Sequence, residues 1–313
     1  MCFFSPAINA DMRTTFENPD TQNQSELQES ESPSSPSHIL LAVPNAMNTG
    51  GIDIFHLPSE RRISTIPEDS STTTGMVMGV EIFISHGDNK LYVVSCYEDG
   101  SAMVHSHHNS IVIPTPGQDS ESDIRWKKLY SNKPHSQPVL SLGLPSTKKD
   151  HFFTSSADAM IVKHPIPKMT AGGANKTVTM PLKVVNTKHS GQQGLKIRSD
   201  RKIFATAGWD SKARVYSCKT MKELAVLKWH NEGCYAIAFA DVGIDLDISQ
   251  SRSERTHSTN AASENQQGNT AMMQHDRGRS LAMIKQQRSR KAQLTHWIAA
   301  GSKDGKISLW DIY

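Results

Sequence analysis

The side chains of this chain that could do chemistry are aspartates, histidines and hydroxyl groups that recur together. Four short turns each carry an aspartate between two apolar runs, at intervals of 59, 52 and 94 residues: Asp99, Asp158, Asp210 and Asp304. Two of these turns follow a histidine and a threonine, in the sets His135, Thr154 and Asp158, and His189, Thr206 and Asp210. These are the components of a nucleophilic triad, but an enzyme needs only one triad. Because the set recurs, it favours a turn network in which the carboxylate accepts hydrogen bonds from backbone amides and from the histidine.

An aromatic or histidine side chain follows each of these aspartates by six residues. It is Trp310 in the last unit and Tyr216, His164 and His105 in the units before it. A ring at this place can hold the strand hydroxyl that in turn holds the upstream histidine. In the last unit, however, Ala300 stands where the hydroxyl is expected. We therefore expect these units to depend on packing more than on the polar network.

Three neighbouring histidines, His105, His107 and His108, raise the alternative of a metal site. His105 and His107 would point to one face of a strand, but no cysteine or acid stands beside them at the spacing of metal ligands. The turn Gly301–Lys306 is one residue short of a phosphate-binding loop, and no helix pattern follows it. We expect no metal, no cofactor and no catalytic residue.

Short apolar runs rich in β-branched and aromatic residues must position these side chains. They are bounded by Gly, Asp, Ser or Asn, which is typical of strands, and no long helical period competes. The aspartate intervals approach the length of a four-stranded propeller blade once roughly forty residues of insertion are subtracted from the last. The runs fall into five units. The first has three strands, at 39–44, 52–57 and 61–66. The next three have four strands each, from 77–85 to about 129, from 138–144 to 186 and from 194–199 to 229. The last has three strands, at 234–240, 296–301 and 306–312.

These runs predict an all-β propeller with about five blades and 18 strands. The first and last units have three strands each, so we expect the propeller to be incomplete or open. Trp209 lies in one of the turns and is expected at the surface, whereas Trp126 and Trp229 are expected in the core.

Charge is spread unevenly, although the formal net charge is only +3. Residues 1–37 carry −5, and residues 249–293 carry +5. Both regions bury too little apolar surface to offset the entropy of ordering. We predict a disordered acidic tail over 1–37 and a disordered basic insertion at about 243–294, within a propeller domain that spans 38–313. The basic cluster of the insertion is expected to be a solvated loop, with binding of an acidic partner, nuclear import or contact with nucleic acid as alternatives.

The small total charge argues against direct nucleic-acid contact. No apolar run approaches the ~18–20 residues that span a membrane, so no membrane partner is expected. The four cysteines are widely spaced and predict free thiols, with neither a disulfide framework nor a zinc site.

The repeating unit, which ends in Leu309-Trp310-Asp311, resembles the WD40 repeat. The stretches 52–67 and 296–313 resemble more closely the fungal ASTRA-associated protein 1 family of WD-repeat proteins, over roughly 38–242 and 295–313 and without that family's N-terminal repeats. The resemblance implies a nuclear, non-enzymatic scaffold of the ASTRA complex, involved in chromatin remodelling and in maturation of PI3-kinase-related kinases. It also implies that the partners are protein subunits of that complex and that no small molecule is bound.

Two other classes of function remain open. A WD-repeat adaptor of another nuclear or cytoplasmic complex, such as a ubiquitin ligase, would use a Trp-Asp-x-Arg box. Neither Trp-Asp pair of this chain has arginine at that place, because Tyr313 stands there after Trp310-Asp311 and Lys212 after Trp209-Asp210. A propeller enzyme would need carboxylates or a metal that converge on the central axis, and the sequence shows no such constellation.

Overall fold

The computed structural model describes residues 39–85, 87–107, 126–169, 176–241, 283–291 and 295–312. The strands in these residues are β1 (Ile39–Pro44), β2 (Ile52–Leu57), β3 (Arg61–Ile66), β4 (Val77–Ile84), β5 (Leu91–Tyr97), β6 (Ala102–His107), β7 (Trp126–Asn132), β8 (Val139–Gly143), β9 (His151–Ser156), β10 (Met160–Pro165), β11 (Lys183–Asn186), β12 (Gln192–Ile197), β13 (Ile203–Gly208), β14 (Lys212–Ser217), β15 (Glu223–Lys228), β16 (Cys234–Phe239), β17 (Trp297–Ser302) and β18 (Ile307–Asp311).

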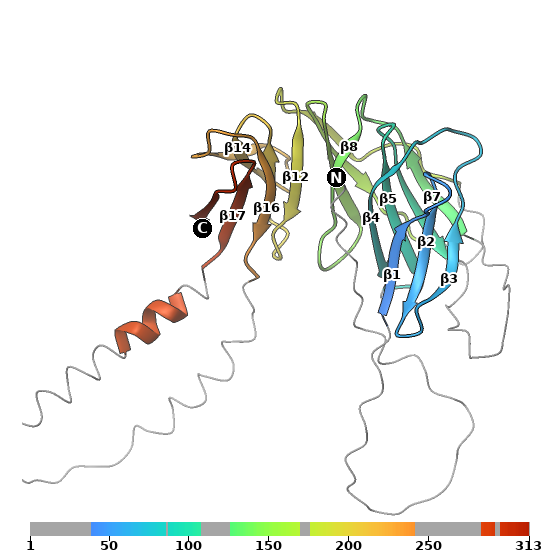
Figure 1. Cartoon of the computed structure of the whole chain (residues 1–313), viewed down its shortest axis with the longest axis horizontal. Helices are drawn as coiled ribbons and strands as arrows, with labels where there is room; N and C mark the ends of the chain where they lie inside the picture. Colours follow the sequence, from blue (N-terminus) through green and yellow to red (C-terminus); the bar gives the residue numbers. More distant parts are fainter. Residues whose placement is uncertain are drawn as a thin grey trace, which may run out of the picture.

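The strands form five antiparallel sheets, each built from strands consecutive in the chain. The sheets are β1–β3, β4–β7, β8–β11, β12–β15 and β16–β18. Strand β4 packs against β8, β8 against β12 and β12 against β16, while β1 packs against β4. Figure 1 shows the resulting arc, with β1–β3 at one end and β16–β18 at the other. The predicted all-β architecture of about five blades in an open arrangement is confirmed for the described residues.

Central strands of the sheets are more deeply buried than outer strands. The central strands β5 and β13 are buried along their whole length, and their sequences are continuous small or apolar runs. The outer strands β11 and β15 are mostly exposed and carry lysines, which discourage pairing with other chains at a free edge. In these strands, small and apolar residues are therefore found at the centre of the sheet and charged residues at its outer edge.

Apolar side chains from facing sheets form the core between them. Leu40 and Ile54 of the first sheet pack with Val80 and Val93 of the second. Aromatic rings join the third and fourth sheets, since Phe153 stacks on Phe204 with centroids 4.6 Å apart and Phe204 stacks on Tyr216 at 5.1 Å. Such stacked rings contribute beyond the apolar area that they bury, and they fix the angle between neighbouring sheets.

Hydrogen bonds gather the turns of the predicted aspartates on one face of the arc. Val77 N donates to Thr49 O, Asp99 N to Thr74 O, and Trp209 N to Gly191 O. These bonds join the β1–β2, β5–β6 and β13–β14 turns to the connections between successive sheets. We call this surface the aspartate face; it comprises residues 45–51, 67–76, 98–101, 133–138, 157–159, 187–191, 209–211, 229–233 and 303–306. The other ends of the strands form the opposite face.

Two regions predicted to be disordered lie largely outside the described residues, namely 1–37 and most of 243–294. Within the second region, residues 283–291 form an exposed helix. The sequence at 281–284 allows the start of a short helix here, because Met, Lys, Gln and Arg are good helix formers and no glycine or proline interrupts them. Among the described residues, no helix is long and apolar enough to cross a membrane.

Candidate functional site

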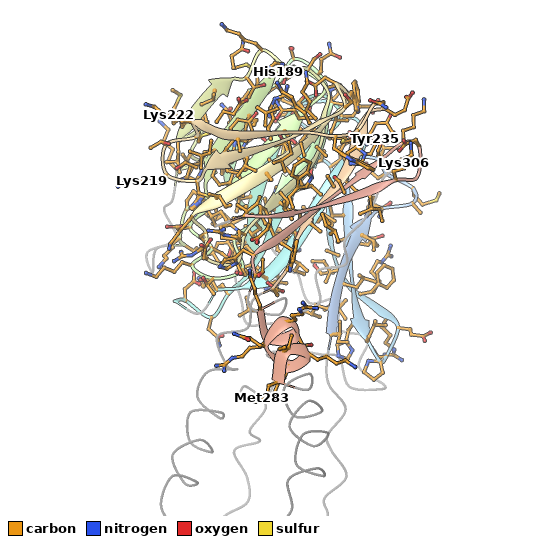
Figure 2. All side chains as sticks on the ribbon, turned by 90° about the vertical axis from the view of Figure 1, so that its left-hand side faces the viewer. His189, Lys219, Lys222, Tyr235, Met283 and Lys306 are labelled. Atoms are coloured by element: carbon orange, nitrogen blue, oxygen red, sulfur yellow. The ribbon has the colours of Figure 1, made fainter. Side chains whose placement is uncertain are left out.

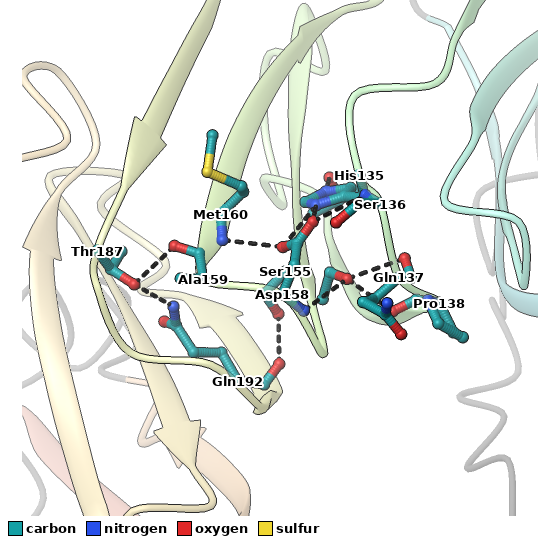
Figure 3. Close-up of polar contacts among 12 residues, drawn as sticks. His135, Ser136, Gln137, Pro138, Ser155, Asp158, Ala159, Met160, Thr187 and Gln192 are labelled. Carbon is teal, nitrogen blue, oxygen red and sulfur yellow. Dashed lines mark hydrogen bonds and ion pairs between the residues drawn. The ribbon is translucent and has the colours of Figure 1, made fainter.

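The predicted set of His135, Thr154 and Asp158 is assembled around the β9–β10 turn. His135 Nε2 lies 2.8 Å from Thr154 Oγ1, and His135 Nδ1 lies 3.1 Å from Asp158 Oδ1. Asp158 also accepts hydrogen bonds from the backbone amides of Ser136 and Met160, at 3.0 and 2.9 Å. Figure 3 shows these contacts converging on the carboxylate. The aspartate thus ties its own turn to the connection that precedes its sheet.

The network continues past Thr154 into the sheet. Thr154 Oγ1 lies 2.8 Å from His164 Nε2, and His164 Nδ1 lies 2.7 Å from the hydroxyl of Tyr130. His164 therefore fills the place of the expected tryptophan. Tyr130, which the sequence did not indicate, adds a fifth member from the neighbouring sheet.

The acceptor-only carboxylate of Asp158 fixes the direction of every bond in this chain. His135 must donate from Nδ1, so its Nε2 accepts the proton of the Thr154 hydroxyl. Thr154 then accepts from His164 Nε2, and His164 Nδ1 accepts from Tyr130. Burial lowers the pKa of His135 although Asp158 opposes the shift, and burial lowers the pKa of His164 well below its ordinary value. Both rings are therefore neutral, as this order requires.

The hydroxyl in this set is inaccessible to a substrate. Thr154 and His164 are fully buried and His135 is 2% exposed. A nucleophile must reach a bound substrate, which Thr154 cannot do. The arrangement holds a turn, and it offers no site for acyl transfer.

The predicted set of His189, Thr206 and Asp210 does not form the same network. His189 Nδ1 lies 3.9 Å from Asp210 Oδ2, too far for a hydrogen bond. Thr206 Oγ1 makes no hydrogen bond of normal geometry to any residue that the structure describes. Arg214 instead holds Asp210 through two hydrogen bonds, of 3.0 and 2.5 Å. The expectation for His189 and Thr206 is thus corrected, because the bidentate guanidinium of Arg214 binds both oxygens of the Asp210 carboxylate.

The electrostatics of this pair follow from its position. The Arg214 side chain is 2% exposed, whereas that of Asp210 is 31% exposed. Burial raises the pKa of Asp210, but the hydrogen bonds from Arg214 outweigh it and leave the pKa below its ordinary value. Arg214 is thus a buried cation whose main counter-charge is Asp210.

The last unit takes its hydroxyl from a different strand. His230 Nε2 lies 2.8 Å from Ser308 Oγ, and Trp310 Nε1 donates to the same oxygen at 3.0 Å. Ser308 lies on β18, directly across from Ala300 on β17. Asp304 accepts a hydrogen bond from the backbone amide of Lys306 at 3.2 Å and pairs with its ammonium at 3.0 Å.

The β4–β7 unit keeps the aspartate turn, but its described residues do not form the rest of the network. Asp99 Oδ1 accepts a hydrogen bond from the amide of Ser101 at 2.9 Å. His105 is buried in the tryptophan place, and its Nδ1 has no hydrogen-bond partner among the described residues. Gly100 has a φ of +92°, and a Cβ there would lie 2.3 Å from the carbonyl oxygen of His135. Only glycine allows this turn to touch the next sheet so closely.

Exposed aromatic side chains lie on the aspartate face near the end of the arc. Trp209 is 46% exposed, Trp229 54% and Tyr235, at the start of β16, 40%. Trp209 was expected at the surface, whereas the core expectation for Trp229 is wrong, because this residue follows β15 in the connection to β16. We call these three residues the aromatic surface.

Trp209 is fixed in place rather than loosely exposed. Its Nε1 donates to Gln193 Oε1 at 2.8 Å, and its backbone amide donates to Gly191 O at 2.9 Å. A Cβ at Gly191 would lie 2.1 Å from the indole ring, so the ring rests directly on the backbone. Rigid exposed aromatics of this kind are the usual anchors of protein interfaces.

The described residues contain no group of three or more His, Cys, Asp or Glu that could hold a metal ion. His105 and His107 both lie on β6, while His108 falls outside the described residues. His107 packs edge-on against Trp126, with ring centroids 5.1 Å apart. The β17–β18 turn at Gly301–Lys306 joins two strands, which is not the strand-to-helix setting of a phosphate loop.

Comparison with known proteins agrees with the strand pattern. Residues 293–311 match the WD domain, G-beta repeat family. ASTRA-associated protein 1 of Penicillium rubens is 54% identical over 285 residues, which cover 89% of this chain and 64% of the relative. The protein of the same name from Pyricularia oryzae is 37% identical, over 88% of this chain and 68% of the relative. That from Schizosaccharomyces pombe is 40% identical over 55% of this chain and 45% of the relative. The chain thus spans a little under two thirds of the Penicillium protein.

Proposed function

Because the chain belongs to the ASTRA-associated protein 1 family, we propose that it is a non-enzymatic WD-repeat scaffold of the ASTRA complex. In this role it binds protein subunits of that complex in the nucleus and supports chromatin remodelling and the maturation of PI3-kinase-related kinases. The observation that carries the proposal is family membership together with the exposed aromatic surface, in which Trp209 is held in place by Gln193 and Gly191.

The geometry supports a passive mechanism. The Asp158 network and the Asp210–Arg214 pair hold successive turns at fixed positions, so the aspartate face is preorganised before a partner arrives. Preorganisation lowers the entropic cost of association. The aromatic surface supplies large apolar side chains with few rotatable bonds, and neighbouring acids and lysines supply a polar rim.

The buried state of the His–Thr–Asp set supports the non-enzymatic part of the proposal. Thr154 is sealed in the sheet, and its two histidine neighbours use all of their ring nitrogens in fixed hydrogen bonds. A general base must have a nitrogen free to take a proton from a substrate.

Affinity purification of the tagged full chain from nuclear extract tests this function. We expect ASTRA subunits to co-purify with the wild type and to be lost from the triple variant Trp209→Ala, Trp229→Ala, Tyr235→Ala. The matched control is Met180→Ala, Leu182→Ala, which removes two exposed apolar side chains outside the aspartate face and should retain the subunits. Absence of ASTRA subunits from the wild-type sample would contradict the proposal.

A further inference from the structure

The two faces of the arc carry opposite charge. The connections that make up the aspartate face contain eight acids and four lysines, a net charge of −4. On the opposite face, the described residues contain ten lysines and arginines and four acids, a net charge of +6. We call this opposite surface the basic face; it comprises the described residues of 58–60, 85–90, 144–150, 166–182, 198–202 and 218–222.

The acids of the aspartate face are largely satisfied within the chain. Asp158 is bound by His135, Asp210 by Arg214, and Asp304 by Lys306. These carboxylates are used to hold turns and leave little free negative charge for a partner. The charge of the basic face is different in kind, because three of its lysines form no salt bridge with the residues that the structure describes.

Unpaired cations gather where the third and fourth sheets meet. Lys202, Lys219 and Lys222 form no salt bridge with any residue in the described part of the chain. Cys218 N donates to Lys202 O at 2.9 Å, which places the β12–β13 and β14–β15 turns side by side. Figure 2 shows Lys219 and Lys222 at one end of the strands, with Tyr235 and Lys306 at the other.

Further cations surround this position. Lys163 Nζ donates to Cys218 O at 3.4 Å, and Lys183 Nζ donates to Thr220 O at 2.8 Å, so two lysines of the third sheet reach the β14–β15 turn. Arg198 is 5% exposed and holds Asp200 with Nε and Nη2, while its buried Nη1 has no hydrogen-bond partner among the described residues. The region thus combines an arginine held by Asp200 with several lysines.

The composition of the basic face fits an acidic polypeptide better than a nucleic acid. Its described residues include no Trp, Tyr or Phe on which a base could stack. The acids Asp88, Asp150 and Asp200 are interspersed among the cations and would repel a continuous phosphate backbone. Acidic side chains spaced along a flexible chain can avoid these positions and pair with the lysines individually.

The chain itself contains such a segment. Residues 11–31 carry six acids and one base, Arg13. They lie a few residues before Ile39, which begins β1. Thr49, in the turn at the other end of β1, belongs to the aspartate face. Ile39 therefore lies at the end of β1 that belongs to the basic face. Covalent attachment to β1 raises the effective concentration of this segment at the basic face.

We propose that the acidic segment 11–31 docks on the basic face of its own chain, around Lys202, Lys219 and Lys222. In this state the segment covers the basic face, and an acidic partner must displace it. The inference concerns the face opposite the aromatic surface and does not depend on the proposed scaffold function.

Zero-length carbodiimide cross-linking of the full chain, read by mass spectrometry, tests the docking. We expect carboxylates of 11–31 to couple to lysines of the basic face and not to Lys133, Lys188, Lys303 or Lys306. The variant Lys202→Gln, Lys219→Gln, Lys222→Gln should reduce these cross-links about tenfold, the effect of losing three exposed ion pairs. The matched control is Lys188→Gln, Lys303→Gln, Lys306→Gln, which should leave them unchanged. Raising the salt from 0.05 to 0.5 M should reduce them as well, because salt screens exposed charges.

Two outcomes would overturn the inference. One is an even distribution of cross-links over the lysines of both faces. The other is cross-linking between copies, detected by mixing 14N- and 15N-labelled protein, which would show that the segment binds a second molecule. Circular dichroism of both lysine variants verifies that they fold, so a loss of cross-links can be assigned to the loss of charge.

Discussion

Ser308 stands directly across the β17–β18 pair from Ala300 and supplies the hydroxyl that Ala300 lacks. Its oxygen accepts from Trp310 Nε1 at 3.0 Å and lies 2.8 Å from His230 Nε2. Paired positions of neighbouring strands point their side chains to the same side of the sheet, so a hydroxyl on either strand can reach the same two rings. The last unit therefore keeps the link between histidine, hydroxyl and tryptophan, with the hydroxyl moved by one strand, whereas His230 Nδ1 has no hydrogen-bond partner among the described residues.

The Ser308→Ala variant tests this substitution of roles. It leaves the buried ring nitrogens of His230 and Trp310 without their common partner, which should lower the free energy of unfolding by about 1–3 kcal/mol. Adding Ala300→Ser should recover part of the loss, because the hydroxyl returns from the paired position. Urea denaturation followed by tryptophan fluorescence measures both changes. Equal stability of Ser308→Ala and the wild type would show that the shared hydroxyl does not contribute.

Thr154 and Thr206 occupy equivalent places in successive sheets but should differ in their contribution to stability. Thr154→Val removes the hydroxyl that joins His135 to His164, and we expect a loss of about 1–3 kcal/mol. Thr206→Val is the matched control, since Thr206 Oγ1 makes no hydrogen bond of normal geometry within the described residues, and it should change stability by less than about 0.5 kcal/mol. A similar loss in both variants would contradict the difference between the two networks.

Asp210→Ala should destabilise the chain by removing the main counter-charge of a buried guanidinium. Breaking a buried ion pair costs about 3–5 kcal/mol; because Asp210 is partly exposed, we expect about 2–4 kcal/mol. Adding Arg214→Met should recover much of this loss, since no buried charge is then left unpaired. Thermal unfolding of the two variants gives the comparison. If the double variant is less stable than Asp210→Ala alone, Arg214 stabilises the sheet independently of Asp210.

Acid should destabilise the fold through its buried histidines. Burial lowers the pKa of His105 to about 4, and burial also lowers the pKa of His135 and His164. The unfolded chain binds protons near the ordinary value of about 6.5, so it gains protons before the folded state does. For His105 the stabilisation is complete above about pH 6.5 and is lost as the pH falls from 6.5 toward 4, by up to about 1.4 kcal/mol per pH unit. His135 and His164 add a loss in the same direction below about pH 6.5.

The His105→Phe variant isolates one of these protons. Phenylalanine keeps an aromatic ring in the buried place and does not titrate. The free energy of unfolding of this variant should therefore fall less steeply between pH 6.5 and 5, by up to about 1.4 kcal/mol per pH unit, which corresponds to one proton. Urea denaturation at several pH values gives the slope. An unchanged slope would mean that His105 is already protonated in the folded chain.

Most of the fold could be predicted from the sequence, because short strands and aspartate turns are local signals. The strand 39–44 was placed from its own apolar run, and the structure gives it the same bounds. The arc was also predictable, since three strands could be placed in the first and last units and four in each unit between them.

The polar networks were harder to predict because their members come from different strands. Tyr130 reaches His164 across a separation of 34 residues, and Ser308 replaces Ala300 through strand pairing. A pairing register would have indicated Ser308, but aspartate spacing alone does not provide one. Arg214 could have been found from the sequence, because it follows Asp210 by four residues. In the structure its guanidinium binds the Asp210 carboxylate in place of the expected His189.

Hydrogen–deuterium exchange of the tagged chain, alone and bound to co-purified ASTRA subunits, tests the scaffold function most directly. We expect slower exchange in the bound sample at residues 209–211 and 229–235, which carry the aromatic surface. Protection there, with little change in the buried strand β13, would show that partners dock on the preorganised aspartate face. Protection confined to the basic face, or none at all, would contradict this mode of binding.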